Sequence, residues 1–389
     1  MRILIAQDSI DADGGVETYL LSVMTELRHR GHQLALAYCT GGASRSLVPS
    51  IAHSLVQVGA LPLTSAIEEI ARWKPDVCYS HNMGMLEVDG AMIGRWPVVK
   101  MLHGFFGTCV SGLKMHAWPA AVACDRTCGP ACLALYLPRR CGQLSPSAMI
   151  QGYSWARRQR ALFARYRSIV VASRFMGEEV ARHGAASNRI NVVPLFSTVT
   201  ETVSGHDGEP DTVLFAGRMT PLKGGQVLIP AVARAGRTLG RTIRLIMAGD
   251  GPEREAWRQL ACAMHVPVEM TGWVSGADRA RVYARGMALV VPSLWPEPFG
   301  LIGLDAAALG RPAVAFNVGG IGEWLADGVN GTLVEPTQGE KGLASAIAGL
   351  LANADQRARM ARGAVEAASR LSVAAHVNAL ERVLQEAAA

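Results

Sequence analysis

The chain has 389 residues, of which 50% are hydrophobic and 18% are charged, and its formal net charge is +6. This composition can bury large cores and excludes a disordered or fibrous protein, while the length predicts two domains. The mild positive charge fits an anionic small-molecule ligand or light contact with an anionic membrane surface, although an ordinary protein surface explains it as well.

The first apolar run, residues 3–6, turns polar at Gln7 and Asp8. It is too short for a signal peptide and indicates a first β-strand. No stretch of the sequence approaches the roughly 18 uninterrupted apolar residues that a membrane-spanning helix requires. We therefore predict a cytoplasmic protein, with a peripheral position at the inner face of the cell membrane as the alternative.

Short apolar runs alternate with helical patterns through the first half of the chain. Residues 16–30 predict a helix with one apolar face, which stops at Gly31. Strands are predicted at residues 3–6, 33–38, 77–80, 98–102, 168–172 and 189–193. Strands that alternate with helices predict parallel pairing through crossover connections.

A polar stretch, residues 196–211, interrupts this pattern and predicts an interdomain linker because it contains two glycines and a proline. A second alternating series follows, with strands at residues 212–216, 243–248, 268–271, 288–291 and 313–316 and helices at residues 343–351, 354–370 and 374–387. We predict an α/β fold of two doubly wound, Rossmann-like domains, with a ligand in the cleft between them at the carboxyl ends of the strands.

The segment from Phe215 to Gly224 carries two cations, Arg218 and Lys223, between a predicted strand and the start of a helix. Helix N-termini offer free amides and a positive dipole end to phosphate. Arg can bind two phosphate oxygens at once, and Lys acts as a compact charge. The segment therefore predicts a phosphate site, with solvated surface charges as the alternative.

Two carboxylates follow the predicted strand at residues 288–291. Glu297 lies in the loop, and Asp305 lies eight residues later, where an apolar helix is predicted. Carboxylates accept hydrogen bonds from the vicinal hydroxyls of sugar and ribose rings. An acid in an apolar stretch is usually paired or functional, so Asp305 is the more informative of the two.

Six motifs in this order resemble glycosyltransferase family 4 closely over residues 212–370 and more loosely at Gly14-Gly15-Val-Glu17. They are Arg218 with Lys223, Gly249-Asp-Gly-Pro252, Gly272-Trp273, Pro292-Ser293, Glu297-Pro-Phe-Gly300 and Gly319-Gly320 with Glu323.

This resemblance implies the GT-B fold of two facing Rossmann-like domains. Residues 1–200 would form an acceptor-binding domain, residues 210–372 a nucleotide-sugar-binding domain, and the helix in residues 374–389 would pack back on the first domain. The implied enzyme is a retaining hexosyltransferase, active in processes such as polysaccharide biosynthesis. It would move a sugar from a nucleotide-diphosphate donor to a hydroxyl of a glycan, a lipid-linked sugar or a metabolite. It would use no catalytic cofactor and no nucleic acid.

The same resemblance implies roles for single residues. Arg218 and Lys223 would hold the donor diphosphate and stabilise charge on the departing nucleotide, as a metal ion does elsewhere. Glu297 would contact the donor sugar, and Asp305 would hold the ribose, although the family usually has Glu at that position. Further donor-binding positions are Gly14, Gly15, Gly217, Phe299, Gly300 and Leu301.

Two histidines each follow a predicted strand of the first half. By the resemblance, His103 would contact the donor sugar as part of the catalytic site, and its position at a strand end agrees with that role. His81, with the adjacent Asn82, is predicted to contact the acceptor or the donor. A hydrogen-bonded histidine at a strand end is the alternative for both.

Five cysteines, Cys109, Cys124, Cys128, Cys132 and Cys141, lie within 33 residues. In a cytoplasmic protein such clustering favours a metal over disulfides and predicts a structural zinc site. Disulfides, an iron–sulfur cluster and free buried thiols are the alternatives. We hypothesise that the cluster staples an insertion after His103 that shapes the acceptor pocket.

Residues 155–167 carry five arginines beside apolar side chains. They predict an amphipathic surface helix, with docking on anionic lipid as the alternative. Neither a P-loop nor a G-x-G-x-x-G fingerprint occurs, which disfavours kinases and dehydrogenases. A nucleotide-sugar-binding protein without catalysis and an epimerase or phosphorylase of the same fold remain as alternative functions.

Overall fold

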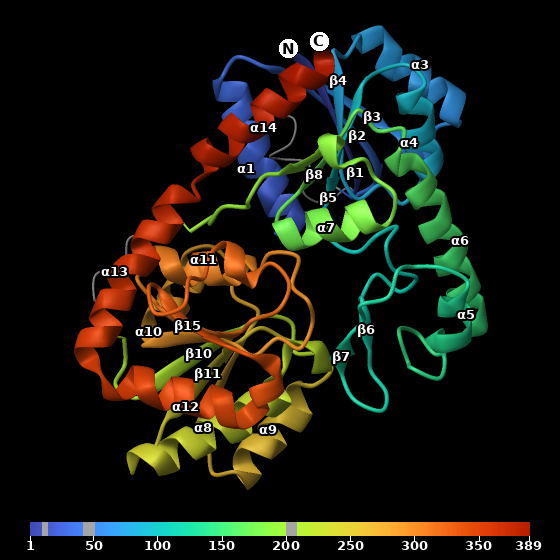
Figure 1. The fold of residues 1–389 in the computed structure, drawn as a ribbon. Coiled ribbons are helices and arrows are strands. Elements are labelled where there is room, and N and C mark those ends of the chain that lie inside the picture. Colours follow the sequence, from blue (N-terminus) through green and yellow to red (C-terminus); the bar gives the residue numbers. More distant parts are fainter. Residues whose placement is uncertain (10–14, 42–50, 200–207) are drawn as a thin grey trace. The chain divides into compact units, whose positions relative to one another are not determined.

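The structure is a computed structural model that describes residues 1–9, 15–41, 51–199 and 208–389. The chain divides into two compact units (Figure 1). The first unit comprises Met1–Lys114, Asp125–Thr198 and Val373–Ala389, and the second comprises Met115–Cys124 and Val199–Ser372. Each unit is built on a parallel sheet flanked by helices, so the predicted α/β class with two doubly wound domains is confirmed.

The sheet of the first unit has the strand order β3-β2-β1-β4-β5-β8-β9, and all its pairs are parallel. The central strand, β4, and its neighbour β5 are buried throughout, as expected for strands covered on both faces. The strands are β1 (Arg2–Ser9), β2 (Gln33–Thr40), β3 (Ser54–Gln57), β4 (Val77–Ser80), β5 (Val98–Leu102), β8 (Ser168–Val171) and β9 (Ile190–Val192).

Helices cover both faces of this sheet. Helices α1 and α14 lie on one side of it, and α3 and α4 lie on the other (Figure 1). The helices of this unit are α1 (Gly15–His29), α3 (Leu63–Trp73), α4 (Leu86–Ile93), α5 (Ala131–Tyr136), α6 (Pro146–Phe163), α7 (Arg174–Arg182) and α14 (Val373–Ala388). Helix α6 ends at Phe163, so the last arginines of the predicted segment 155–167 lie beyond it.

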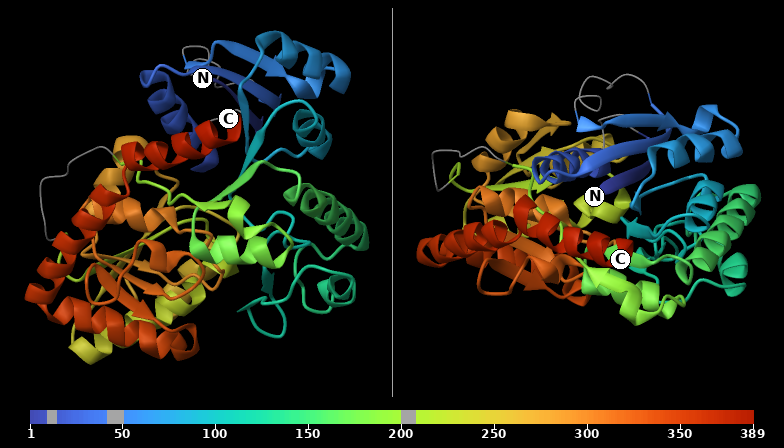
Figure 2. Two further views of the ribbon diagram at one scale, coloured as in Figure 1. Left: turned by 45° about the horizontal axis from the view of Figure 1, so that its top comes forward. Right: turned by 90° about the horizontal axis from the view of Figure 1, so that it is seen from above.

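The final helix, α14, packs beside α1 at the surface of the first unit (Figure 2). Its His376 accounts for part of this contact. The Nε2 atom of His376 lies 2.8 Å from the Tyr19 hydroxyl of α1, and its Nδ1 atom lies 2.7 Å from the carbonyl oxygen of Pro194. The last segment of the chain is therefore anchored to the first unit by a buried polar contact as well as by apolar packing.

The sheet of the second unit has the order β12-β11-β10-β13-β14-β15 and is also parallel throughout. Helices α8 and α12 lie on one face of it, and α11 lies on the other (Figure 1). Its strands are β10 (Thr212–Ala216), β11 (Arg244–Ala248), β12 (Val268–Gly272), β13 (Ala288–Val291), β14 (Ala313–Phe316) and β15 (Gly331–Val334). Its helices are α8 (Gly225–Leu239), α9 (Arg254–Ala263), α10 (Gly276–Arg285), α11 (Leu301–Ala308), α12 (Gly339–Ala352) and α13 (Ala354–Arg370).

Two short strands, β6 (Met115–His116) and β7 (Val122–Ala123), form a separate antiparallel pair. Strands β3 and β15 were not predicted, because they combine polar residues or glycine with only two apolar residues each, whereas the equally short β13 and β14 are continuous apolar runs. No helix within the described ranges combines the length and the apolar character that crossing a membrane requires.

Candidate functional site

A lysine–carboxylate pair lies at the carboxyl edge of the second sheet. The Lys223 ammonium is 2.6 Å from Oε1 of Glu297, and the Ser293 hydroxyl donates to the same oxygen at 2.6 Å. Glu297 is 4% exposed, whereas the Lys223 side chain keeps 23% of its surface exposed. The carboxylate therefore fixes the position of the ammonium group and leaves it accessible to a ligand.

Local backbone geometry places Lys223 there. Residues Pro221–Lys223 form a 3-10 turn, and Gly224 follows with a φ of +76° directly before helix α8. A Cβ atom at Gly224 would lie 1.9 Å from the carbonyl oxygen of Pro292, which directly follows strand β13. Only glycine permits both the positive φ and this close approach. The turn thus brings Lys223 against Glu297 and beside the amino end of α8.

The loops after β10 and β11 also meet closely. The amide of Gly217 donates to the Ala248 carbonyl at 2.9 Å, and a Cβ atom at Gly249 would lie 2.0 Å from the Gly217 carbonyl oxygen. Both glycines have positive φ angles, of +138° and +135°. This packing positions the predicted residue Arg218, whose side chain is exposed at the same edge of the sheet as Lys223.

A fourth glycine supports the backbone of Glu297. A Cβ atom at Gly319 would lie 2.2 Å from the carbonyl oxygen of Glu297, and the amide of Gly320 donates to that oxygen at 2.7 Å. The loop after β14 therefore clamps the backbone of Glu297. This close approach is the structural reason for the glycine at position 319.

The predicted ribose residue, Asp305, lies on helix α11 and is 2% exposed. Its Oδ2 atom lies 3.4 Å from the Arg279 guanidinium of α10. Burial, with the charge of Asp305 as a second cause, raises the pKa of the adjacent Tyr283. The acid is thus paired within the second unit, as its apolar surroundings require.

Three further predicted donor positions surround the start of α11. Gly300 has a φ of +87° and precedes the helix, which begins at Leu301. Phe299 is buried, and its carbonyl oxygen accepts a hydrogen bond from the Trp324 indole at 2.8 Å. These residues turn the chain between Glu297 and Asp305 and hold both carboxylates in one unit.

In the first unit, His81 and His103 come together. They follow the adjacent strands β4 and β5, and His81 Nδ1 lies 2.9 Å from His103 Nε2. Burial lowers the pKa of His81 well below its usual value and that of His103 to about 3. Both rings are therefore neutral at physiological pH, and one of them donates a hydrogen bond to the other.

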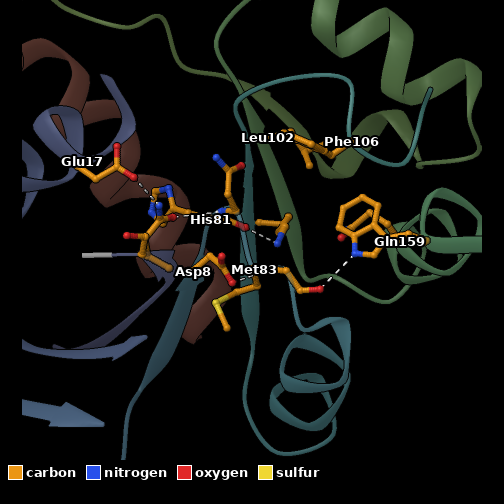
Figure 3. A pocket seen from close by; sticks show the side chains of 13 residues that line it. Asp8, Glu17, His81, Met83, Leu102, Phe106 and Gln159 are labelled. Carbon is orange, nitrogen blue, oxygen red and sulfur yellow. Dashed lines mark hydrogen bonds between the residues drawn. The ribbon is translucent and has the colours of Figure 1, made fainter. Parts of the chain in front are cut away.

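A pocket of about 320 Å³ opens beside this pair (Figure 3). The predicted residues His81 and Asn82 line it, while His103 contributes through its hydrogen bond to His81. The other lining residues are Gln7, Asp8, Ser9, Glu17, Met83, Gly84, Lys100, Leu102, Phe106, Trp155 and Gln159. All of them belong to the first unit.

A buried polar network forms the floor of this pocket. The Lys100 ammonium donates to Asp89 at 2.7 Å, to Ser80 at 3.1 Å and to the His81 carbonyl at 2.5 Å. The Tyr166 hydroxyl donates to the same carboxylate at 2.6 Å. The ion pair is almost completely buried, with side-chain exposures of 3% for Lys100 and 0% for Asp89.

The predicted zinc site is not assembled. Within the described part of the chain, no three His, Cys, Asp or Glu side chains are grouped to hold a metal ion. The sulfur of Cys109 accepts from the Lys114 amide at 3.3 Å, and that of Cys141 contacts the Leu135 carbonyl at 3.9 Å. The clustering in sequence, which includes Cys124, is therefore not a clustering of four ligands in space.

Two of these cysteines do meet. The Cys132 thiol, through its hydrogen bond with Cys128, raises the pKa of Cys128, and the same bond lowers the pKa of Cys132 to about 6. Their spacing of four residues places them across the turn that begins helix α5. Both are free thiols, which is one of the alternatives that the sequence left open.

Among the predicted glycines of the first unit, Gly15 begins helix α1, and Gly14 lies outside the described residues. The sequence interpretation did not assign Arg279, Asp8 or Trp155 to a site. A lysine inside the apolar strand β5 was the one available signal for the buried network, because such a residue needs a partner.

Two Rossmann-like units, each with its loops at the carboxyl edge of a parallel sheet, define the GT-B class of folds. The solved structure of HepE from Anabaena, in complex with UDP and glucose, supports this class with a TM-score of 0.72 over 99% of this chain and 100% of that chain. The two sequences are 20% identical, so this likeness concerns the fold.

Family models match most of both units. Residues 13–196 match Glycosyltransferase Family 4, and residues 210–353 match Glycosyl transferases group 1. The chain belongs to the glycosyltransferases that these two models describe.

Curated relatives agree with this assignment. A D-inositol 3-phosphate glycosyltransferase of Stackebrandtia nassauensis is 36% identical over 178 residues, which is 42% of this chain and 40% of the relative. A glycogen synthase of Mycobacterium tuberculosis is 37% identical over 159 residues, which is 39% of this chain and 37% of the relative. The matches thus span less than half of the length of these two relatives.

Proposed function

We propose that this protein transfers a hexosyl group from a nucleotide-sugar donor to an acceptor hydroxyl with retention of the anomeric configuration. The observation that carries the proposal is the accessible Lys223 ammonium at the amino end of α8, which is held by the Glu297 carboxylate, itself fixed by a hydrogen bond from Ser293. A fixed cation beside free helix amides is suited to the diphosphate of a nucleotide sugar.

In this proposal the second unit binds the donor. Lys223 and Arg218 hold the diphosphate and stabilise the negative charge that develops on the departing nucleotide. Because Lys223 is already fixed by a buried carboxylate, little reorganisation is needed when the bond to the sugar breaks. The acceptor hydroxyl attacks from the face that the nucleotide leaves, through an oxocarbenium-like state, and this geometry retains the configuration.

Glu297 and Asp305 bind hydroxyls. One oxygen of Glu297 is engaged by Lys223 and Ser293, and a carboxylate has further acceptor sites for the hydroxyls of the donor sugar. Asp305, oriented by Arg279, accepts from the ribose. The neutral His103, held by His81, donates to a hydroxyl of the transferred sugar as it reacts.

The donor nucleotide is proposed to be UDP, because the structure of HepE contains UDP. The names of the two relatives suggest contrasting acceptors, a phosphorylated cyclitol and the glucan glycogen. The first unit, with α14 packed on it, is proposed to bind the acceptor, and the reaction is proposed to take place in the cytoplasm. No catalytic cofactor is needed in this mechanism.

The proposal is tested by product analysis. The full chain is incubated with UDP-glucose, GDP-mannose or ADP-glucose and a panel of sugar and cyclitol acceptors. Nucleotide release is measured, and the anomeric configuration of the product is assigned by NMR. We expect one donor to give a glycoside with the anomeric configuration of that donor. A product with the inverted configuration would contradict the proposed mechanism. If no donor gives a product with any acceptor, the proposal that the protein is a transferase is contradicted.

A matched pair of variants localises the activity. Lys223→Ala removes the proposed diphosphate contact, whereas Arg258→Ala removes an exposed cation of α9 that pairs with Glu255 in the same unit. Only the first variant is expected to lose activity. Equal losses in both variants would indicate a general effect on folding.

A further inference from the structure

We propose that the pocket of the first unit selects an acceptor without phosphate or carboxylate groups, namely a neutral or amino-substituted polyhydroxylated ring. This inference rests on the proposed transferase function and names the chemical class of its acceptor. According to this inference, phosphorylated rings are not acceptors. The supporting observations are the charges and the aromatic surface of the pocket.

The pocket has an acidic side. Asp8 and Glu17 lie on one side of it, and Phe106 and Gln159 lie on the other, with His81 between them (Figure 3). Asp8 accepts from the Gly84 amide at 3.1 Å, and Glu17 accepts from Gln7 at 3.3 Å. These bonds orient both carboxylates and leave further acceptor sites for ligand hydroxyl or ammonium groups. An anionic group there would meet like charges.

No cation among the described lining residues compensates for these acids. Lys100 is the single Lys or Arg of the lining, and its three donors are directed to Asp89, Ser80 and the His81 carbonyl. A lysine ammonium has three donors, so none remains for a phosphate. Lys100 is also only 2% exposed. Its charge is therefore used inside the protein.

The histidine in the wall does not supply a positive charge either. His81 is fully buried, and burial lowers its pKa well below the usual value. Its Nε2 atom has no hydrogen-bond partner among the described residues. His81 therefore adds no positive charge to the wall that could offset the two acids.

The opposite side of the pocket is aromatic. Phe106 is 43% exposed and packs edge-on against Trp155, with the ring centres 5.8 Å apart and an interplanar angle of 75°. The Trp155 indole donates to the Gly84 carbonyl at 3.1 Å, which fixes its orientation. Such a surface binds the apolar face of a sugar ring, and it attracts an ammonium group as well.

Carboxylates on one side and aromatic rings on the other match one kind of ligand. The hydroxyl or amino groups of a ring can bind Asp8 and Glu17 while its carbon face contacts Phe106 or Trp155. A phosphate on the same ring would replace a favourable contact by repulsion. Charge complementarity of this kind sets specificity between otherwise similar ligands.

Binding of matched ligands to the full chain tests this inference. The probes are glucose, glucosamine and glucose 6-phosphate, and myo-inositol with myo-inositol 3-phosphate, measured by ligand-observed NMR at the same ionic strength. We expect the neutral and amino rings to bind at least about tenfold more tightly than their phosphorylated counterparts. Equal or tighter binding of the phosphorylated rings, or binding of none of the rings, would overturn the inference.

Isosteric variants locate the discrimination. Asp8→Asn and Glu17→Gln keep the shape of the pocket and remove one charge each. Glucosamine should therefore bind more weakly to these variants, and the ratio of its affinity to that of glucose 6-phosphate should fall by about threefold or more. Glu366→Gln, at an exposed position of α13 in the other unit, removes the same charge outside the pocket and serves as the control for the change of net charge. An unchanged affinity ratio in both pocket variants would contradict the proposal that Asp8 and Glu17 discriminate between these ligands.

The outcome is separable from the proposed function. Nucleotide binding by the second unit is measured in parallel by thermal shift. If nucleotides bind and products form but phosphorylated rings are preferred, only the acceptor class is wrong. If the neutral rings bind but no nucleotide binds and no product forms, the transferase proposal fails, while the ligand preference of the pocket stands.

Discussion

Two lysine–carboxylate pairs have nearly the same length and opposite surroundings. Lys223 lies 2.6 Å from Glu297 in the second unit, and Lys100 lies 2.7 Å from Asp89 in the first. The first of these lysines is 23% exposed, and the second is 3% exposed. Burial therefore decides their roles. The Lys223 ammonium remains available to a ligand, whereas the Lys100 ammonium is fully hydrogen-bonded to neighbouring polar groups and stabilises the pocket floor.

Removing one partner of the buried pair is expected to have the largest effect on stability. In Asp89→Ala, Lys100 would keep a buried charge without its counter-ion, which typically costs about 3–5 kcal/mol. Chemical denaturation followed by circular dichroism measures this loss. Asp89→Asn is the milder control. The comparison variant is Glu87→Ala, on the same helix as Asp89, which removes an exposed ion pair with Arg158 of α6. A loss in Asp89→Ala no larger than that in Glu87→Ala would contradict the difference in roles.

Breaking the accessible Lys223–Glu297 pair should affect activity more than stability. Lys223→Ala is expected to lower kcat/KM by roughly 10²–10³-fold, the range found when a group that stabilises transition-state charge is removed. Its unfolding midpoint should fall less than that of Asp89→Ala, because Lys223 is 23% exposed and Ser293 still donates to the Glu297 carboxylate in the variant. Steady-state kinetics and a denaturation curve of one preparation check both statements. A large loss of stability with retained activity would reverse our assignment.

Acid should weaken the first unit through its buried histidines. Burial lowers the pKa of His376 to about 4, so between pH 6.5 and pH 4 the unfolded chain binds more protons than the folded chain. Stability is therefore complete above pH 6.5 and falls as the pH decreases through this window. Between pH 7 and pH 5 the loss from His376 is about 2 kcal/mol.

Urea denaturation of the full chain at pH 7 and at pH 5 measures this loss of stability. His376→Gln keeps a neutral polar side chain beside Tyr19 and should show a smaller loss on acidification than the native chain. An identical pH dependence in both proteins would show that protonation of this histidine does not limit the stability of the unit.

The smallest predicted effect concerns Trp295. Its ring lies 4.8 Å from the Lys223 ammonium. A cation–π contact at a partly exposed site contributes about 0.5–1 kcal/mol, so Trp295→Leu should weaken nucleotide binding about two- to fivefold. Isothermal titration calorimetry measures the change. Trp295→Phe, which keeps a ring, should have a nucleotide affinity between those of the native chain and Trp295→Leu. A loss as large as that of Lys223→Ala would indicate direct contact with the nucleotide.

Much of the second unit could be predicted because its motifs are local. Strand ends, the glycine turns and the positions of Lys223, Glu297 and Asp305 all follow from short segments of sequence. The partner of Asp305 could not be predicted in this way, since Arg279 comes from another helix and only the fold brings them together. The same holds for the contact of Gly319 with Glu297, which joins two separate loops.

The first unit was harder to interpret. The sequence placed His81 and His103 after predicted strands but did not predict their contact. That contact depends on the strand order that makes β4 and β5 neighbours, which is a property of the whole sheet. The acidic and aromatic sides of the pocket combine residues from β1, α1, the loop after β5 and α6. The cysteine spacing was misleading, because closeness in sequence does not arrange thiols around one point.

The central claim is that the second unit binds a nucleoside diphosphate through Arg218 and Lys223. A thermal-shift titration of the full chain with UDP, GDP and ADP tests it most directly. At about 100 times the dissociation constant, a ligand stabilises the folded protein by about 2.7 kcal/mol. We predict a concentration-dependent shift with one nucleotide that is lost in Arg218→Ala and Lys223→Ala and kept in Arg258→Ala. No shift with any nucleotide, or the same shift in all three variants, would contradict the claim.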